Sequence, residues 1–399
     1  MAEWVKVRIG DLCKTNAKSY SPKEGWTFVN YLDTGNITKN VIDEVQYIDL
    51  SKEKLPSRAK RKVEHNSVLF STVRPNQAHY GIIKSQPENF LVSTGFAVMD
   101  ADSERLDPDY LYYLLSSNEI VEGLHAIAEQ STSAYPSIKP SDIENLEVDV
   151  PDIETQKKIS VVLVSIDEKI RSNTAINKNL EQQAQALFKS WFLDYDPWDG
   201  EVPDSWINGK LGDFTDIKRG GSPRPIQEYL SESGLRWLKI SDVTSLQTPF
   251  VIDIKDHIIE AGLKKTVFLK AGSLVLSNSA TPGVPKILDV DSCIHDGWLY
   301  FPKSKFSNEY LYLYFKYIRQ QLVNLSNGSV FNNLKTDILK GYPTILPDEE
   351  TLHRFDEIVK PMFLQMQNLT RESHRLADTR DAILPQLMSG ELDVSDLAI

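Results

Sequence analysis

The most constraining feature of this sequence is a run of core-type positions, spaced alternately by four and three residues, between Ile159 and Trp191. This is the a/d spacing of a coiled coil, so it predicts a long helix with one seam. No proline or glycine occurs between Asp152 and Pro197 to interrupt such a helix. About 40 residues at about 1.5 Å each form a rod of about 60 Å. The predicted seam residues are Ile159, Leu163, Ile166, Ile170, Leu180 and Leu187, with Asn173 and Asn177 near the middle.

The same spacing returns 196 positions later in the chain. Each copy follows a proline and an acidic residue, Pro151-Asp152 and Pro347-Asp348, which favour the start of a helix. One such seam alone is more typical of a helix in an ordinary bundle, but the repetition favours two rods that pack on each other. The second seam comprises Val359, Met362, Met366, Leu376 and Ile383, with Ser373 as its polar interruption.

The repeat continues outside the two rods. The segment WVKVRIGD from Trp4 resembles WINGKLGD from Trp206, and NSVLFSTVRP from Asn66 resembles GSLVLSNSATP from Gly272. Two globular halves that each lead into a long helix form an internal duplication. We expect four parts: a globular domain over 1–150, a long helix over 151–196, a second globular domain over 197–346, and a long helix with its tail over 347–399.

This connectivity predicts the arrangement of the parts. Because the first rod delivers the chain to the second domain, a second rod that packs on the first must run back antiparallel. The predicted fold class is mixed α/β (α+β), with two similar globular domains, two long antiparallel coiled-coil helices and an approximate two-fold axis. The domains are then expected at opposite ends of the pair.

Composition restricts the class of protein. The 399 residues carry a formal net charge of −12, which disfavours non-specific coating of nucleic acid but allows local basic patches. The two cysteines, Cys13 and Cys293, match no disulfide or metal motif. No apolar run approaches the roughly 20 residues that a membrane span needs. We therefore expect a cytoplasmic protein with no membrane contact.

Sequence motifs for catalysis are absent. There is no Walker A loop, no G-x-G-x-x-G, no H-E-x-x-H, no Cys/His cluster and no Asn/Asp-Pro-Pro-aromatic run of an amino-methyltransferase. Gly220-Gly221-Ser222 is more typical of a turn than of a phosphate-binding loop. We therefore predict no catalytic residue, no metal ligand and no cofactor held by this chain.

Residues that can contact DNA occur at matching places in both halves. A basic run from Arg58 to Lys62 precedes a polar loop, and Lys264, Lys265 and Lys270 precede a similar loop that ends near Lys286. Alone, such a run more often marks a solvated face. Lys and Arg bind phosphates, whereas Asn, Gln, Ser and Arg can also contact base edges. The candidates are Lys60, Arg61, Lys62, Ser71, Thr72, Arg74, Asn76, Gln77, Ser131, Thr132, Tyr135 and Lys139 in the first half, and Lys218, Arg219, Arg224, Lys264, Lys265, Ser277, Asn278, Ser279, Ser329, Asn332, Asn333 and Lys335 in the second.

Several motifs resemble one protein family. The stretches LEQQAQALFKSWFLDYDP, LPDEET and DAILPQLMSGEL, with two diverged domains that open on Ile/Leu-Gly-Asp, resemble the specificity subunit of Type I restriction–modification systems. The resemblance covers essentially the whole chain. It departs at one candidate partner-contact position, where Gln156 of the first rod is replaced by Leu352 in the second.

The resemblance implies a specific set of roles. Two target-recognition domains each bind half of a bipartite DNA site, and the helices set the spacing and dock two methyltransferase subunits. Motor-nuclease subunits add restriction. S-adenosylmethionine, ATP and Mg²⁺ then belong to the partner subunits. We therefore predict a non-catalytic DNA-recognition subunit that binds double-stranded DNA. The alternatives are a structural coiled-coil adaptor without DNA specificity and an enzyme with cryptic catalysis.

Overall fold

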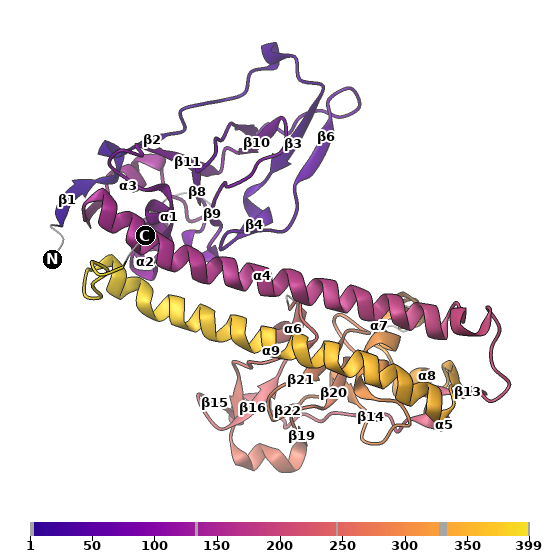
Figure 1. The fold of residues 1–399 in the computed structure, drawn as a ribbon. Helices are drawn as coiled ribbons and strands as arrows, with labels where there is room; N and C mark the ends of the chain where they lie inside the picture. Colours follow the sequence, from indigo (N-terminus) through magenta and orange to yellow (C-terminus); the bar gives the residue numbers. More distant parts are fainter. Residues whose placement is uncertain (1–3, 132–134, 245, 327–332, 398–399) are drawn as a thin grey trace. The chain divides into compact units, whose positions relative to one another are not determined.

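A computed structural model describes residues 4–131, 135–244, 246–326 and 333–397 (Figure 1). The chain forms two compact units, each of which is described by itself. Unit 1 combines Met1–Glu168 with Leu376–Ile399, and unit 2 is Lys169–Arg375. This division differs from the four consecutive parts expected from the sequence, because each unit contains one globular domain and a segment of both long helices.

The two predicted rods are present as the helices α4 (Ile153–Phe192) and α9 (Glu349–Met388), each of 40 residues. Helix α9 continues through two interior prolines, Pro361 and Pro385, although proline removes a backbone donor from a helix. Both helices pass through the boundary between the units. Within the described part of the chain, no helix is long and apolar enough to span a membrane.

In unit 1 the two helices run antiparallel. Near the middle of the pair, the Arg380 guanidinium donates to the Asp167 carboxylate at 2.6 Å. Toward the start of α4, Ile159 and Leu163 belong to the same core cluster as Leu384 and Leu387 near the end of α9. Residues near the start of α4 therefore pack against residues near the end of α9, which is the predicted antiparallel arrangement.

The helix segments of unit 2 pair in the same sense. Asn173 donates through Nδ2 to Ser373 Oγ at 3.3 Å, and Asn177 donates to Thr370 Oγ1 at 3.1 Å. The predicted mid-seam asparagines thus face polar residues of the other helix. A buried asparagine specifies register in a coiled coil at some cost in stability. Where the domains lie relative to each other stays a prediction.

The predicted seam residues are all buried or half-buried. The buried members are Ile159, Leu163, Val359 and Met366, and the half-buried members are Ile166, Ile170, Leu180, Leu187, Met362, Leu376 and Ile383. The heptad pattern missed Phe188, Phe192 and Phe363, which are at most 6% exposed. These three lie in the core cluster of unit 2, where the helices pack on a globular domain as well as on each other. That extra contact makes the apolar stripe wider than an a/d seam.

The globular part of unit 1 contains two four-stranded sheets, ordered β6-β3-β10-β7 and β2-β11-β8-β9, with the small sheets β1-β12 and β4-β5. The strands are β1 (Val5–Arg8), β2 (Cys13–Thr15), β3 (Phe28–Leu32), β4 (Ile37–Thr38), β5 (Val41–Ile42), β6 (Gln46–Asp49), β7 (Ala59–Arg61), β8 (Val68–Ser71), β9 (Tyr80–Ile82), β10 (Phe90–Ser93), β11 (Phe96–Ala101) and β12 (Glu147–Val150). The helices are α1 (Pro108–Ser116), α2 (Asn118–Glu129) and α3 (Pro140–Glu144).

The globular part of unit 2 contains two five-stranded sheets, ordered β14-β23-β20-β21-β17 and β15-β18-β16-β22-β19, with the pair β13-β24. The strands are β13 (Ile207–Lys210), β14 (Lys218–Arg219), β15 (Leu230–Ser231), β16 (Leu235–Leu238), β17 (Phe250–Val251), β18 (His257–Ile258), β19 (Val267–Leu269), β20 (Leu274–Ser277), β21 (Pro285–Leu288), β22 (Ser292–Ile294), β23 (Trp298–Tyr300) and β24 (Pro343–Leu346). The helices are α5 (Leu211–Phe214), α6 (Ser241–Thr244), α7 (Asn308–Ser326) and α8 (Thr336–Lys340).

The strand pairs that close the two domains show the internal repeat. Val5 pairs with Val150 at one end of β1-β12, and Ile207 pairs with Leu346 at the same place in β13-β24. Both pairs are antiparallel and four residues long, and each leads directly into a long helix. The mixed α/β fold with a duplicated domain is therefore confirmed.

In each unit, a hydrogen bond between a serine hydroxyl and an aspartate carboxylate joins the globular domain to its long helix. The residue that carries the carboxylate differs between the two units. In unit 1, Asp107 caps α1, and its Oδ1 accepts a hydrogen bond from Ser160 of α4. In unit 2, Ser307 accepts from the Tyr310 N–H and donates to Asp356 of α9 at 2.6 Å. Carboxylate and hydroxyl have changed places, so the hydrogen bond between domain and helix is kept.

Gln156 has an internal role rather than the expected contact with a partner. Its side chain is 1% exposed, and Oε1 accepts the Asp107 N–H at 2.8 Å. Nε2 donates to the carbonyls of Arg105 (3.1 Å) and Pro151 (2.9 Å). In this structure Gln156 therefore holds the start of α1 against α4.

Replacing Gln156 with Leu, the residue at the repeat position, should destabilise unit 1 by about 1–3 kcal/mol, since one buried and two part-buried backbone groups lose a hydrogen bond to its side chain. Urea unfolding followed by circular dichroism measures the effect. The control is Gln182→Leu, at an exposed position of the same helix. Equal stability of the two variants would contradict the internal role.

Candidate nucleic-acid interface

Three loops of unit 1, far apart in the sequence, meet at Thr72. Its backbone N–H donates to the Gly95 carbonyl at 2.8 Å, and its carbonyl accepts from the Ile138 N–H at 2.9 Å. The next residue, Val73, forms an isolated bridge with Ser137. The loop after β8, the turn between β10 and β11, and the segment before α3 therefore form one surface, named here the unit 1 loop cluster.

Unit 2 builds the same junction at Asn278. Its N–H donates to the Gly297 carbonyl at 2.9 Å, and its carbonyl accepts from the Leu334 N–H at 2.8 Å. The segments paired by sequence similarity thus occupy matching places in the two domains. The loop after β20, the turn before β23 and the segment before α8 form the unit 2 loop cluster.

Exposed polar side chains project from the unit 1 loop cluster. Arg74 has a φ of 47° and its guanidinium carbon lies 5.1 Å from the centre of the Tyr135 ring. Asn76 and Gln77 are exposed in the following 3₁₀ turn, η4 (Pro75–Gln77). A left-handed backbone at a non-glycine residue costs energy and is enriched at functional sites. The turn thus presents a stacked guanidinium and two amides together.

Three predicted base-contacting residues are instead buried. Ser71 is 2% exposed and donates to the Val73 carbonyl at 2.9 Å. Ser277 is 0% exposed and accepts the Val284 N–H, while Asn278 is 3% exposed and donates to the Asp296 carbonyl at 3.2 Å. A buried side chain has no access to a base edge in this conformation. The structure therefore corrects the prediction: these residues hold the loops in place.

The basic run of unit 1 divides into available and occupied cations. Lys60 is exposed on β7. The Arg58 guanidinium packs against Gly95 so closely that a Cβ atom added to this glycine would lie 2.6 Å from it. Lys62, by contrast, forms an ion pair with Glu24 and lies 5.0 Å from the Trp26 ring centre. Burial lowers the pKa of Arg61, which is half-buried.

In unit 2, basic side chains surround the Asp296 carboxylate. Arg224 Nη2 lies 3.2 Å and Arg219 Nη2 3.8 Å from Asp296 Oδ2, while Ser222 donates to Oδ1 at 2.6 Å. Partial burial acts to raise the pKa of Asp296, but the Ser222 hydrogen bond and the two guanidinium groups outweigh it, so the pKa is lowered. Asp296 is therefore ionised at neutral pH and orients both arginines beside the loop cluster.

The remaining candidate residues differ in their solvent exposure. Lys139, Lys218, Lys264 and Lys335 are exposed, whereas Thr72, Ser131, Ser279 and Asn333 are half-buried. Lys265 is exposed, but its ammonium donates to the Tyr229 hydroxyl at 2.6 Å. Thr132, Ser329 and Asn332 lie outside the described residues.

Lys286, near the end of the predicted polar loop of the second half, is 5% exposed and donates to the Leu246 carbonyl at 2.9 Å. Burial lowers its pKa to about 8. It shares a cavity of about 160 Å³ with Ser277 of the loop cluster and with two cations of α7, Lys316 and Arg319. Sequence reasoning missed these two cations because three-residue spacing on an amphipathic helix is typical of any solvated face.

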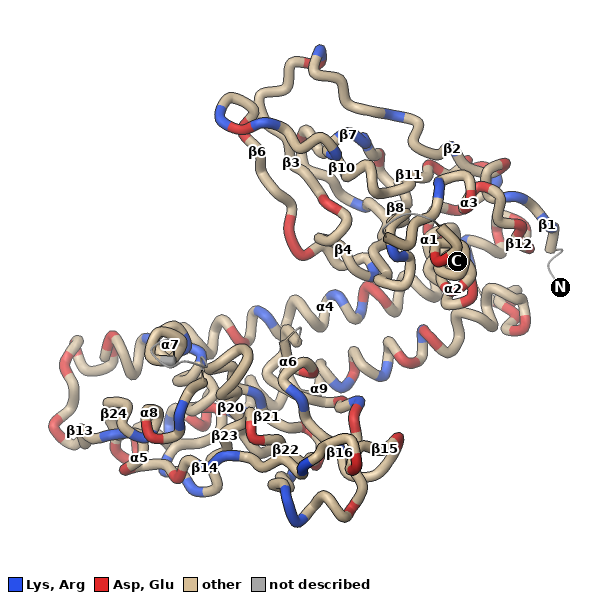
Figure 2. Tube along the Cα trace, turned by 180° about the vertical axis from the view of Figure 1, so that it is seen from behind, with Lys and Arg blue, Asp and Glu red and all other residues tan. Residues whose placement is uncertain are grey.

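Figure 2 shows Lys and Arg interspersed with Asp and Glu along both units. Charge alone therefore does not define the interface. The distinguishing feature is the repeated three-loop junction with exposed Arg, Asn, Gln and Lys side chains around it. Such side chains are suited to phosphates and base edges in a DNA groove.

Comparison with known proteins agrees with this class of site. The family described as "Type I restriction modification DNA specificity domain" matches residues 1–182 and 203–371, one copy in each half. The chain belongs to this family. Its role is that of a non-catalytic DNA-specificity component, which excludes the alternative of an adaptor without DNA specificity.

Individual relatives extend over the whole chain. The specificity subunit of the HindI Type I restriction enzyme of Haemophilus influenzae is 26% identical, over 98% of this chain and all of the relative. The MjaIX specificity subunit of Methanocaldococcus jannaschii is 24% identical, over 92% of this chain and 84% of the relative. The crystal structure of a Type I restriction–modification S subunit from M. genitalium has the same fold, with a TM-score of 0.60 at 16% identity over 97% of this chain and 96% of that one.

Proposed function

We propose that the two loop clusters each bind one half of a bipartite sequence in double-stranded DNA. The observation that carries this proposal is that the two loop junctions share the same backbone hydrogen bonds but expose different side chains. Thr72 and Asn278 make the same two backbone hydrogen bonds. The exposed groups nevertheless differ, with Arg74, Asn76 and Gln77 around one junction and Arg219 and Arg224 around the other. A common frame with divergent contacts is what two unequal half-sites require.

The chemistry of the exposed groups fits groove recognition. Asn and Gln can bind adenine through two hydrogen bonds, and Arg can bind guanine in the same manner. The stack of Arg74 on Tyr135 limits the freedom of the guanidinium before DNA binds, which reduces the entropy lost on binding. Exposed lysines such as Lys60 and Lys335 are suited to phosphates.

Catalysis is assigned to partner subunits in this proposal. Two methyltransferase subunits that carry S-adenosylmethionine dock on the specificity subunit, and motor-nuclease subunits with ATP and Mg²⁺ add restriction. The assembly acts in the cytoplasm. The long helices α4 and α9 set the spacing of the half-sites and provide docking surface.

The test of the proposal is methylation mapping in cells that carry this chain and its co-encoded methyltransferase. Asn76→Ala with Gln77→Ala should lower methylation of the native site at least about fivefold, since one lost bidentate pair costs about 1–3 kcal/mol. The matched control is Gln86→Ala, at an exposed amide of unit 1 that lies outside the loop cluster and lines no cavity discussed below. Unchanged methylation by the double variant would show that the side chains of η4 do not contact the DNA site.

Phosphate contact predicts a contrast between two neighbouring lysines. Lys60→Ala should weaken binding to every sequence and reduce the slope of log affinity against log salt by about 1, because one fewer counterion is released. Lys62→Ala should leave the slope unchanged, because Glu24 already neutralises that ammonium. Fluorescence anisotropy over a salt series measures both slopes. Equal slopes for the two variants would indicate that the basic run is a solvated surface without phosphate contact.

A further inference from the structure

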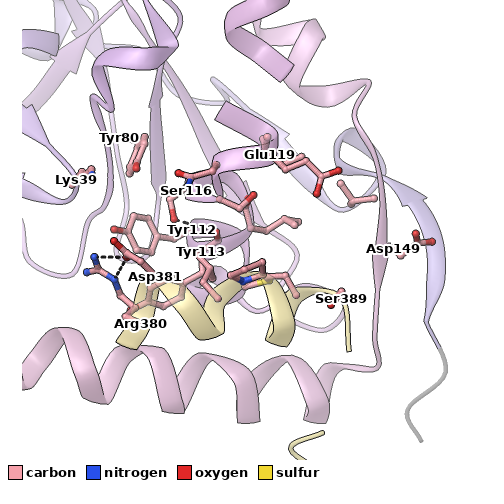
Figure 3. Close-up of a pocket in the computed structure, with 18 of the residues that line it drawn as sticks. Lys39, Tyr80, Tyr112, Tyr113, Ser116, Glu119, Asp149, Arg380, Asp381 and Ser389 are labelled. Atoms are coloured by element: carbon pink, nitrogen blue, oxygen red, sulfur yellow. Dashed lines mark hydrogen bonds and ion pairs between the residues drawn. The ribbon is translucent and has the colours of Figure 1, made fainter. Parts of the chain in front are cut away.

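Unit 1 contains a cavity of about 650 Å³ whose lining does not include Thr72, Gly95 or Ile138 of its loop cluster (Figure 3). Its walls come from α1, the start of α2, β12 and the last turns of α9. Figure 3 shows Lys39, Tyr80 and Arg380 toward one end, and Asp149 and Ser389 toward the other. The volume is typical of a ligand-binding pocket.

Unit 2 has a cavity at the matching place, of only about 200 Å³. The internal repeat equates Trp4 with Trp206, each just before the first strand of its domain, and both tryptophans line their cavities. The aligned β12 and β24 form one wall in each case, and the ends of α9 and α4 form another. The two cavities are therefore equivalent, and one of them is largely filled.

Aromatic side chains account for the filling in unit 2. Phe188 and Phe192 lie at the end of α4, where α9 has Leu384 and Met388, and α7 supplies a buried tyrosine where α1 has Leu114. The ring centres of Phe192 and Trp206 lie 5.8 Å apart. The same positions in unit 1 hold smaller side chains, so the space stays open.

The chain itself completes the filling in unit 2. Beyond α4, Tyr195 lines the cavity, and its ring centre lies 5.9 Å from that of Trp206. The position equivalent to Tyr195 in the tail after α9 is Glu391, which is exposed. Among the described residues of the tail after α9, no aromatic side chain takes the place that Tyr195 takes in unit 2.

The open cavity is acidic. Five carboxylates and two cations are among its lining residues. One of the cations, Arg380, is already paired with Asp167 at 2.6 Å and Asp381 at 2.7 Å. At the rim, Glu119, Glu147 and Asp149 are exposed. An occupant that carries positive charge beside an apolar group therefore complements the site.

We propose that this cavity is a docking pocket for an aromatic side chain, flanked by Lys or Arg, that the methyltransferase partner presents. The inference rests on the proposed function, in which such a partner binds. It adds a location and a chemistry: the partner supplies to unit 1 the aromatic plug that unit 2 supplies to itself. A buried aromatic anchor in a pocket is the usual energetic centre of a protein interface.

The test fills the cavity by placing in unit 1 the larger side chains found at the equivalent positions of unit 2. The double variant Leu114→Tyr with Met388→Phe and, separately, the rim variant Asp149→Lys are each titrated with the co-encoded methyltransferase subunit by isothermal calorimetry. Both should weaken binding at least tenfold, the first by occupying the space and the second by reversing the charge.

The control for filling is Leu230→Phe, at a leucine of β15 that is 41% exposed, lies outside both long helices and does not line the cavity. The control for charge is Glu122→Lys, at an exposed position of α2 outside the cavity. Both controls should bind like the native chain. Binding of the filled and rim variants within twofold of the native value, with native circular dichroism, overturns the pocket. If the native chain binds no methyltransferase, it is the proposed function that fails.

Photo-crosslinking identifies the occupant without relying on the folding of a filled variant. A benzophenone amino acid at Ser389, in the cavity wall, should crosslink to a methyltransferase peptide that contains an aromatic residue beside Lys or Arg. The same group at the exposed Ser103, outside the cavity, should not. A crosslink to a second copy of this chain, or none in the assembled complex, contradicts the proposal.

Discussion

Replacing residues 203–346 with the corresponding domain of a relative should change one half of the methylated sequence and leave the other half intact. The boundaries of the exchange follow from the structure. Strands β13 and β24 lie near the two ends of this segment and pair with each other, so a donor domain brings its own closing sheet. The unit 1 loop cluster is built entirely from residues before position 140, so its frame is unaffected.

The donor must keep two contacts with the long helices. Ser307 donates to Asp356 of α9 at 2.6 Å, and the Tyr312 hydroxyl donates to Glu181 of α4 at 2.7 Å. A donor that lacks either group removes one hydrogen bond from a half-buried carboxylate, at a cost of about 1–3 kcal/mol. The donor domain should therefore carry Ser and Tyr at these positions, or Asp356 and Glu181 should be changed with it.

Methylation mapping by single-molecule sequencing measures the outcome. The expected result is a hybrid site with one native half and one half taken from the donor. The control is the reciprocal chimera, which should give the complementary hybrid. A chimera that assembles and yet changes both halves would show that the two clusters do not bind DNA independently.

The long helices could be predicted from the sequence because their signal is local and repeated. Alternation of four and three residues reports directly on the helical period, and 196 positions separate two matching copies. The strand order of the sheets could not be predicted in this way. Many strands here have only two to four residues, as in β14 (Lys218–Arg219), which is too short for alternation to identify.

The candidate site could be predicted only at the level of segments. The sequence paired the loops that follow β8 and β20, and the structure builds equivalent junctions there. It could not separate Ser71, which supports the loop, from Arg74, which projects from it, because burial depends on the Gly95 and Ile138 segments that meet the loop. Likewise, Glu24 is 38 positions from Lys62, so no local pattern indicates their pairing.

Lengthening both long helices by four residues should shift the spacing of the methylated half-sites by one or two base pairs without altering either half. Four residues add about 6 Å of helix, and each base pair adds about 3.4 Å of duplex. Insertions between Glu168 and Lys169 and between Arg375 and Leu376 fall at the boundary of the two units. They leave intact the Asn173–Ser373 and Asn177–Thr370 hydrogen bonds that specify the helix register of unit 2.

Three variants distinguish a change in spacing from a general loss of stability. A four-residue insertion places a stutter in the heptad pattern, so some loss of stability accompanies it, whereas a seven-residue insertion in both helices keeps the seam and should add about three base pairs. The same insertion in α4 alone mismatches the antiparallel seams and should impair assembly. Methylation mapping of the two matched variants gives the spacer length directly. A matched variant that assembles and still methylates only sites of the native spacing would show that α4 and α9 dock partners but do not determine the distance between half-sites.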